Sequence, residues 1–349
     1  MKRKILVFAM VICLLGTMNI FAEEDQIGIV VDGKPVASSA KIMEGELYIP
    51  LRAVAEALGF EVQWNGVKSQ ILLLSEGRNI TIDLKEAKVT DNGHETYMRS
   101  GSRILNGRTY LGQDFYADVL DLKVTWDKAG SKVSIENVDK NDIVINNLKE
   151  GSESATLKVT LQYPQLKGLE STEVESQLNS FFAKLAEAAI AEGKEAEKNI
   201  IPEQTAAGIK AEVYFTYDVK YNSNGYLSIV FQDYVYSGGA HGLTVQSSHT
   251  YDLKTGKEYT IKDLFKSGTD YVSIISAEVK KQMQEGDLSY TLTPFEAIKP
   301  DQDYYLSNKG LVVYFQQYEY YPYAMGIPEF TIDYSQLTGL LNPEFKVLK

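Results

Sequence analysis

The chain has 349 residues, which is enough for two ordinary domains with separate cores. Its 44% hydrophobic and 23% charged residues are typical of a globular protein and exclude a disordered one. A net charge of -12 disfavours nucleic acid and anionic lipid as partners and favours cationic ones, although acidity also serves solubility alone.

The first 22 residues predict an export signal rather than part of the fold. Lys2, Arg3 and Lys4 precede an apolar run over 5–20, and acidic residues follow Ala22. This pattern is typical of a secretory signal peptide that is cleaved after Ala22. The apolar run is shorter than the roughly 20 residues that a spanning helix needs, and an uncleaved anchor is the alternative.

Cys13 is the only cysteine and lies inside this signal. Val11 and Ile12 precede it, so it lacks the small residue that a lipoprotein signal places before its cysteine. The exported chain would have no thiol, which excludes disulfides, cysteine-ligated metals and a cysteine nucleophile. We expect an extracellular or cell-wall-associated protein that does not contact the membrane after cleavage.

The next part of the chain is a pair of repeats. Residues 45–73 recur at 107–135 without a gap, at a constant offset of 62 positions. The offset places Trp64 on Trp126, and these are the only two tryptophans. Each repeat is predicted to form a strand, a helix, a strand, a turn and a strand.

The first repeat also carries a family resemblance. Pro50 suits the first turn of a helix and Gly59 suits its end. Residues 47–64, Leu-Tyr-Ile-Pro-Leu-Arg-Ala-Val-Ala-Glu-Ala-Leu-Gly-Phe-Glu-Val-Gln-Trp, resemble the copper amine oxidase N-terminal-like domain. The resemblance covers roughly 27–137, and we assign the domain to 23–138. In the oxidases this domain is a peripheral stalk, remote from the copper.

The oxidase activity itself is excluded by the residues that it needs. Such an enzyme requires three histidine ligands, two of them as His-x-His, and a tyrosine that follows asparagine. The only histidines are His94, His241 and His249, no two are separated by one residue, and no Asn-Tyr pair occurs.

The composition changes after about 139–142, since nineteen of the 23 tyrosines lie beyond residue 150. We predict a second region over 139–349, with a first part at about 143–240 and a second part at 241–349. One predicted helix begins at a capping-box pattern of Thr172 and Glu175 and is ended by Gly193, and the other covers about 270–285. Strands are predicted at 155–163, where Pro164 ends the strand, and at 211–221, 226–236, 310–320 and 329–334.

The predicted fold class is therefore α+β. An N-terminal pair of small β-α-β-β repeats precedes a domain with a tyrosine-rich, mostly antiparallel sheet and two principal helices.

Four stretches of this second region carry another resemblance. Residues 160–169, 236–242, 251–265 and 310–330 resemble the paired extracytoplasmic domains of RsiV-type anti-sigma factors, which bind lysozyme, and of the accessory region in PdaC-type peptidoglycan deacetylases. The resemblance covers roughly 143–345. Only four residues precede the apolar run and the sequence ends at Lys349, so we expect neither a sigma-binding segment nor a deacetylase domain.

The first candidate binding segment is a glycine-rich loop that consists of Ser237, Gly238, Gly239, Ala240, His241 and Gly242. Glycines permit positive φ and close approach, and exposed amides there can receive a carboxylate or a sugar hydroxyl. His241 can act as a base or a ligand. The alternative is a tight turn between strands that a local hydrogen bond of His241 fixes. His249 is eight residues away, too far along a strand to share a metal with His241.

The second candidate segment contains Tyr318, Tyr320, Tyr321 and Tyr323. Neighbouring strand residues face opposite sides, so these rings cannot all enter one core and some must reach a surface. Exposed tyrosines favour contacts with proteins or sugars. The alternative is ordinary half-buried residues of a sheet.

These observations predict an exported, non-catalytic binding protein of a Gram-positive-type envelope that needs no cofactor or metal. Its C-terminal region would engage an extracellular ligand, with lysozyme or another cationic protein as the candidate. Residues 151–349 carry 17 basic and 26 acidic side chains, and this charge would speed association with a basic partner. The alternatives are a peptidoglycan- or polysaccharide-binding module and a hydrolase of unrecognised type.

Overall fold

The computed structural model describes residues 27–285 and 291–345. The predicted export signal (1–22), with Cys13, lies outside these residues. The fold is α+β and its sheets are mostly antiparallel, as predicted. Among the described residues, no helix is long and apolar enough to cross a membrane.

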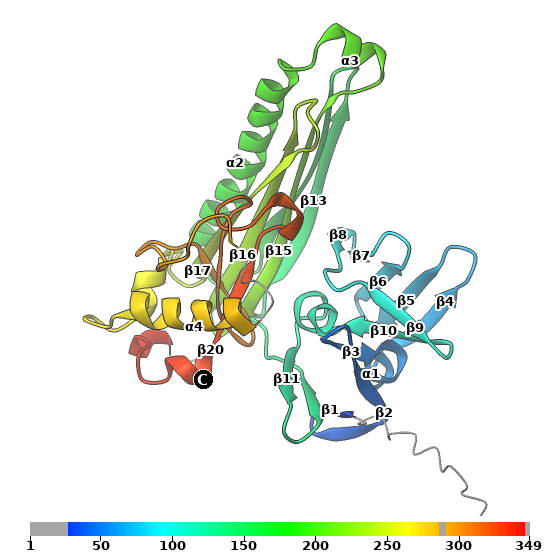
Figure 1. Ribbon diagram of the computed structural model, residues 1–349, viewed down its shortest axis with the longest axis vertical. Coiled ribbons are helices and arrows are strands. Elements are labelled where there is room, and N and C mark those ends of the chain that lie inside the picture. The colour runs from blue at the N-terminus through cyan, green and yellow to red at the C-terminus, as the bar shows by residue number, and fades with distance from the viewer. Residues whose placement is uncertain (1–26, 286–290, 346–349) are drawn as a thin grey trace, which may run out of the picture.

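The chain forms an N-terminal unit (27–137) and a C-terminal unit (143–345) that lie side by side (Figure 1). One core cluster of buried hydrophobic residues lies entirely within the N-terminal unit, and the other clusters lie within the C-terminal unit. The long sheet of the C-terminal unit and the helix along it extend beyond the N-terminal unit (Figure 1).

The N-terminal unit contains two sheets and one α-helix, α1 (Leu51–Ala57). The seven-stranded sheet has the order β11-β12-β1-β2-β3-β10-β9, with β1 (Ile27–Val31), β2 (Lys34–Met43), β3 (Glu46–Pro50), β9 (Ser102–Leu105), β10 (Arg108–Gly112), β11 (Lys123–Asp127) and β12 (Lys132–Glu136). The five-stranded sheet has the order β4-β5-β6-β7-β8, with β4 (Glu61–Asn65), β5 (Gln70–Ser75), β6 (Arg78–Asp83), β7 (Lys88–Asp91) and β8 (His94–Tyr97).

The two repeats meet at a pair of equivalent antiparallel strands, β3 and β10. Ile49 lies opposite Leu111, and these two residues are themselves equivalent under the offset of 62. A local two-fold axis through this pair therefore relates the repeats. The predicted order of elements is present in both: β3, α1, β4 and β5 in the first, and β10, a π-helical turn (Phe115–Val119), β11 and β12 in the second.

The turn predicted between the last two strands of each repeat is present, and it has the same form in both repeats; in the first repeat it follows Asn65. Asn65 Oδ1 accepts a hydrogen bond from the amide of Lys68 (3.2 Å), and the left-handed residue is Ser69, with φ of 54°. Ser131, at the equivalent place after β11, has φ of 46°. The turn thus leaves Gly66 outside the left-handed region.

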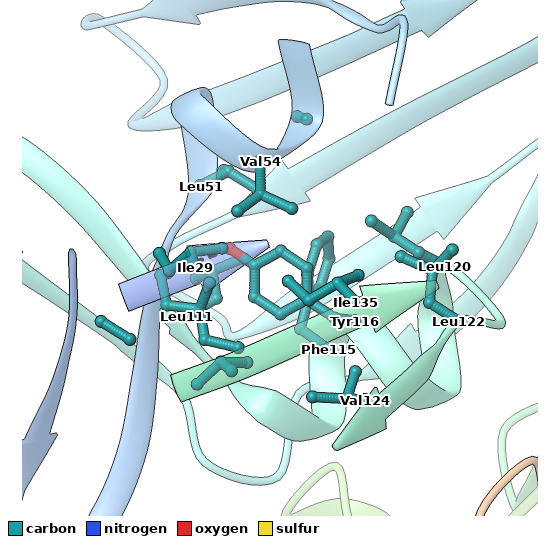
Figure 2. Close-up of a cluster of buried hydrophobic side chains, with 14 of the residues drawn as sticks. Ile29, Leu51, Val54, Leu111, Phe115, Tyr116, Leu120, Leu122, Val124 and Ile135 are labelled. Atoms are coloured by element: carbon teal, nitrogen blue, oxygen red, sulfur yellow. Dashed lines mark hydrogen bonds between the residues drawn. The ribbon is translucent and has the colours of Figure 1, made fainter. Parts of the chain in front are cut away.

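The core of the N-terminal unit is built where the helical segments pack between the repeats (Figure 2). Leu51 and Val54 of α1 lie near Phe115 and Tyr116 of the π-helical turn (Figure 2). Tyr116 is fully buried, and its hydroxyl donates a hydrogen bond to the carbonyl oxygen of Ile49 (2.9 Å). The only polar atom of this large side chain is therefore satisfied inside the core.

The C-terminal unit has a five-stranded and a three-stranded sheet. The first has the order β13-β14-β15-β16-β17, with β13 (Val144–Glu153), β14 (Leu157–Lys167), β15 (Ala211–Ser223), β16 (Tyr226–Tyr236) and β17 (Leu243–Asp252). The second contains β18 (Tyr304–Leu306), β19 (Gly310–Tyr314) and β20 (Glu329–Asp333). The helices are α2 (Thr172–Glu197), α3 (Pro202–Ala206) and α4 (Tyr271–Glu285), and short 3-10 turns cover Ile261–Leu264, Tyr323–Met325, Tyr334–Leu337 and Pro343–Phe345.

Helix α2 differs from the prediction at both ends. The residue that caps it is Ser171, whose hydroxyl accepts from the amide of Val174 (3.3 Å), rather than Thr172. Gly193 does not end the helix, which continues to Glu197. A Cβ at Gly193 would overlap the Val213 side chain on β15, so this glycine allows the helix to lie close to the sheet.

Strand β14 continues past Pro164, where the sequence predicted its end. Its parallel partner β15 pairs only with Leu157–Leu161, so β14 has no neighbour on that side at Pro164. Antiparallel pairing with β13 continues there, and Pro164 lies opposite Asn147. Proline is tolerated on such a free edge because no partner needs its missing N–H.

Candidate binding site

The glycine-rich loop connects β16 to β17, and close packing explains two of its glycines. Gly238 has φ of 86°, and its carbonyl oxygen accepts a hydrogen bond from the Gln204 side chain (2.8 Å). A Cβ at Gly242 would overlap the ring of Tyr234. These contacts fix Gly238 and Gly242 within the connection between the two strands.

The exposed part of the loop consists of Ser237, Gly239, Ala240 and His241. The carbonyl oxygen of Gly239 accepts a hydrogen bond from the hydroxyl of Tyr236 (3.0 Å), which holds this part against its own hairpin.

His241 lies against two of the predicted tyrosines, which come from far along the chain. Its ring stacks on Tyr323, with 3.9 Å between the ring centroids, and Tyr318 lies beside it at 6.4 Å. Nδ1 of His241 donates to the carbonyl oxygen of Gly242 (2.8 Å), which leaves Nε2 to accept from the Tyr318 hydroxyl (3.2 Å). We call His241, Tyr318 and Tyr323 the His-Tyr cluster.

Two glutamines bring the hairpin and the tyrosine segment together. Strand β17 is the last strand of its sheet, and its open edge needs partners. The amide of Thr244 donates to the Gln317 side chain (2.9 Å), and the amide of Gln246 donates to the Gln316 side chain (3.1 Å). Gln316 also donates back to the carbonyl oxygen of Gln246 (2.7 Å).

The backbone after β19 turns the tyrosine segment toward the hairpin. The strand predicted over 310–320 ends at Tyr314, and Gln316 and Glu319 form a turn in which the Gln316 amide donates to the Glu319 carboxylate (3.0 Å). Tyr318 has φ of 66° and is 48% exposed. A left-handed tyrosine is unusual and is held only where its surroundings determine it.

The remaining two predicted tyrosines do not belong to this surface. Tyr321 is 1% exposed and lies in the core of the C-terminal unit, so a partner cannot reach its ring. Tyr320 is half-buried and packs edge-on against Phe295 and Phe315, with centroids at 5.4 and 4.8 Å. Both rings support the turn that presents Tyr318 and Tyr323.

A cleft of about 400 Å³ lies between the two units, and the sequence did not indicate it. It is lined by β8 of the N-terminal unit, by β15, β16 and β17, and by 325–329. The units contact each other along it through polar groups. Gln162 accepts from the amide of Glu95 (2.8 Å) and donates to its carbonyl oxygen (3.1 Å), and the Thr96 hydroxyl donates to Asp218 (3.0 Å).

One end of the cleft is a network of five charged residues: Arg99, Asp118, Asp218, Lys220 and Glu329. Arg99 binds both Asp118 (2.9 Å) and Glu329, and Lys220 lies 3.5 Å from Asp118 and 3.8 Å from Asp218. Burial alone would lower the pKa of Lys220, but the carboxylates outweigh it and raise that pKa above its ordinary value.

The same network keeps Asp118 ionised. Burial alone would raise its pKa, but Lys220 and Arg99 outweigh burial and lower it. Groups that are stabilised in their charged forms neither accept nor release a proton near neutral pH, so the network joins the two units rather than forming an acid–base pair.

The three histidines are dispersed. His94 packs on Tyr217 where the units meet, with 4.5 Å between the rings, and His249 binds Glu258 (2.6 Å) and packs against Phe181. Across residues 27–285 and 291–345, no group of three or more His, Cys, Asp or Glu side chains is arranged to hold a metal.

Comparison with known proteins gives three consecutive matches to family models. These are the copper amine oxidase N-terminal domain (residues 30–135), the deacetylase PdaC (150–244) and DUF3298, a protein of unknown function (262–335). The chain is similar to both groups that the sequence suggested.

Two curated relatives come from Bacillus subtilis. The anti-sigma-V factor RsiV is 29% identical over 230 residues, which cover 62% of this chain and 76% of RsiV. The peptidoglycan-N-acetylmuramic acid deacetylase PdaC is 24% identical over 200 residues, which cover 56% of this chain and 41% of the deacetylase, less than half of its length.

Solved structures of the DUF3298 family are also similar. One from Bacteroides fragilis has a TM-score of 0.48 at 19% identity, covering 60% of this chain and 97% of that chain. One from Pseudomonas aeruginosa has a TM-score of 0.44 at 18% identity, covering 59% and 96%.

Proposed function

We propose that the chain is an exported, non-catalytic binding protein of a bacterial envelope, located outside the cell or on its wall. Its C-terminal unit would engage a cationic extracellular protein, and lysozyme is the candidate that the family resemblance implies. Similarity to an anti-sigma factor supports a non-catalytic envelope protein.

The observation that carries this proposal is the His-Tyr cluster. His241 and Tyr318 are exposed, and Met325, which is 47% exposed, follows in the same turn as Tyr323. Aromatic rings held in place by stacking and a hydrogen bond lose little entropy when a partner covers them, and such rings are enriched in binding hot spots. The surrounding unit is acidic, so a basic partner would be attracted to it.

The test is binding of purified hen lysozyme to the exported form of the chain, measured by biolayer interferometry. We expect binding that weakens as salt rises from 50 to 300 mM. Tyr318→Ala is expected to weaken it about tenfold or more. Val144→Ala serves as the control, because Val144 is comparably exposed (56%) and lies on β13, at the edge of the sheet opposite β17. Absence of binding at low salt, or equal loss in both variants, would refute the proposal for this partner and surface.

The peptidoglycan- or polysaccharide-binding alternative has its own supporting observation, a groove of the N-terminal unit that is lined by Trp64, which is 52% exposed. The charged network does not favour the hydrolase alternative, because the pKa values of Asp118 and Lys220 are shifted toward their ionised forms.

A further inference from the structure

A groove of the N-terminal unit lies between the first repeat and the β9–β10 hairpin, away from the His-Tyr cluster. Its volume is about 590 Å³, a size typical of small-ligand sites. Its floor is apolar, and its walls carry Arg52 and Glu56 of α1, Gln63 and Trp64 of β4, and Ile104 and Arg108 of the β9–β10 hairpin. Trp64 is 52% exposed and Ile104 is 60% exposed.

The two-fold relation between the repeats allows this groove to be compared with its equivalent in the second repeat. The second repeat has a smaller groove of about 220 Å³ where it meets the C-terminal unit. Three residues of the first groove have their equivalents in the second. Arg52 corresponds to Asp114, Glu56 to Asp118, and Val62 to Val124. In the second repeat the chain's own C-terminal unit covers this face, and its Lys220 binds Asp118 (3.5 Å).

The two equivalent tryptophans differ in how far their rings are covered. Trp126 packs partly against the core, and Lys128 covers its ring with the ammonium 4.8 Å from the centroid. The position of Lys128 is taken by Gly66 in the first repeat. Trp64 lies beside Gly66, where an added Cβ would come within 3.2 Å of the indole nitrogen. The indole of the first repeat is therefore bare because glycine stands where a covering side chain stands in the second.

The charges of the two faces also differ. The aspartate of the second repeat, Asp114, is replaced by Arg52, and Arg108 adds a second guanidinium to the groove. Arg52 donates to Glu56 (3.2 Å) and to the carbonyl oxygen of Val62 (2.9 Å). Arg108 is exposed and has no hydrogen-bond or ion-pair partner among the described residues. The free charge of this groove is thus positive, in a chain whose net charge is -12.

We propose that the Trp64 groove binds an anionic glycan strand. The apolar face of a pyranose ring would stack on the Trp64 indole, a carboxylate of the glycan would pair with Arg108, and ring hydroxyls would bond Gln63 and Glu56. A ligand of this kind supplies a partner to the bare Trp64 ring and to the unpaired Arg108 guanidinium. The Gln63 side chain donates to Glu61 (2.8 Å) and keeps its oxygen to accept from a sugar hydroxyl. The site is separate from the His-Tyr cluster, and it goes beyond the proposed protein partner.

The test uses intrinsic tryptophan fluorescence, because the chain has only two tryptophans and only Trp64 borders the groove. The intact exported chain is titrated with glycan strands that contain muramic acid and are freed of their peptides, with neutral chitotetraose, and with oligoglutamate. We expect the acidic glycan to quench the emission, chitotetraose to bind more weakly, and oligoglutamate to have no effect. Trp64→Phe is expected to abolish the quenching, and Trp126→Phe, its matched control, to preserve it.

Two further variants test the chemistry by calorimetry. Arg108→Gln should weaken the acidic glycan about tenfold without changing the affinity for chitotetraose. Gly66→Lys should block both sugars, because it restores over Trp64 the side chain that covers Trp126. Circular dichroism confirms that each variant is folded. Failure of both sugars to bind at millimolar concentration, binding of oligoglutamate in place of them, or unchanged binding in Trp64→Ala would overturn the proposal. Each of these outcomes leaves the lysozyme test of the C-terminal unit unaffected.

Discussion

Replacing Lys220 by methionine tests whether the charged network joins the two units. The Lys220 side chain is 6% exposed and lies between Asp118 and Asp218, whose side chains are 33% and 27% exposed. Methionine keeps most of the volume of the lysine stem and removes its charge. Two partly buried carboxylates would then lose their shared cation.

The expected loss in the free energy of unfolding follows from the burial of Lys220 and of its two carboxylate partners. Removal of one partner from a fully buried pair is destabilising by about 3–5 kcal/mol. Solvent reaches both carboxylates and Arg99 still binds Asp118 (2.9 Å), so we expect about 2–3 kcal/mol at pH 7. Lys210→Met is the control, because the ammonium of Lys210 pairs with the exposed Glu153 (2.7 Å) and donates to the carbonyl oxygen of Ser154 (3.1 Å). The variant should therefore lose about 0.5 kcal/mol of unfolding free energy.

The assay is urea denaturation followed by tryptophan fluorescence, which reports on the N-terminal unit because both tryptophans lie there. The pKa of Asp118 is lowered in the fold, so its stabilisation is present above the unfolded pKa and is lost as pH falls through the folded pKa. The variant raises that folded pKa, and the difference between Lys220→Met and the parent protein should shrink on acidification to about pH 3.5. A difference below 0.5 kcal/mol at pH 7, or one that is the same at both pH values, would refute this account.

Three other predictions each concern a single position. Gly193→Ala should destabilise by about 1–3 kcal/mol in thermal denaturation, since the added methyl overlaps Val213, whereas helix propensity alone would predict a gain of about 1 kcal/mol. Burial, and secondarily the charge of Glu192, raises the pKa of Asp233 to about 6. The ionised carboxylate therefore destabilises the fold, and this effect develops as pH rises from about 4 to 6. Asp233→Asn should raise the free energy of unfolding by about 1–2 kcal/mol at pH 7.5 and change it little at pH 4. Tyr116→Phe should lower the free energy of unfolding by about 1–3 kcal/mol, because the carbonyl oxygen of β3 loses its buried donor, and an unchanged urea midpoint would contradict this.

The repeat pair was the most predictable part of the fold. A gap-free offset preserves the spacing of the hydrophobic residues and the positions of the turn residues. The order of the strands and the place of α1 could therefore be predicted. The prediction did not give the pairing of Ile49 with Leu111, or the separation of the two repeat hairpins into different sheets. Pairing between distant strands depends on tertiary packing, which a local pattern does not contain.

Elements with weak patterns were missed. Strand β13 reads Val-Ile-Asn-Asn-Leu-Lys-Glu-Gly-Ser-Glu, is largely exposed at the edge of its sheet and lacks a sustained apolar alternation, so no periodic signal marks it. Strands β6 to β8 lie between the repeats and were not assigned. The end of α2 was placed at Gly193 because glycine usually ends a helix, but here the same residue permits contact with Val213.

The candidate site shows the same division between local and distant information. The sequence indicated the Gly-rich loop and the tyrosine segment, and the structure places His241 beside Tyr318 and Tyr323; their role in binding stays a prediction. Burial of Tyr321 was not visible, since four tyrosines within six residues have no clear period. The cleft depends on contacts such as Gln162 with Glu95, which are 67 residues apart, and no single motif contains them.

The duplication also explains why one face of the N-terminal unit docks the C-terminal unit and the other does not. The second repeat binds Lys220 of the C-terminal unit through Asp118 (3.5 Å). The offset of 62 places Glu56 at the position of Asp118, and the Glu56 carboxylate already accepts from Arg52 (3.2 Å). Arg52 stands where the second repeat has Asp114, so a C-terminal unit docked on the first repeat would bring Lys220 to a carboxylate that a guanidinium already occupies. The charge changes therefore restrict the C-terminal unit to the second repeat and leave the Trp64 face open to a ligand of opposite charge.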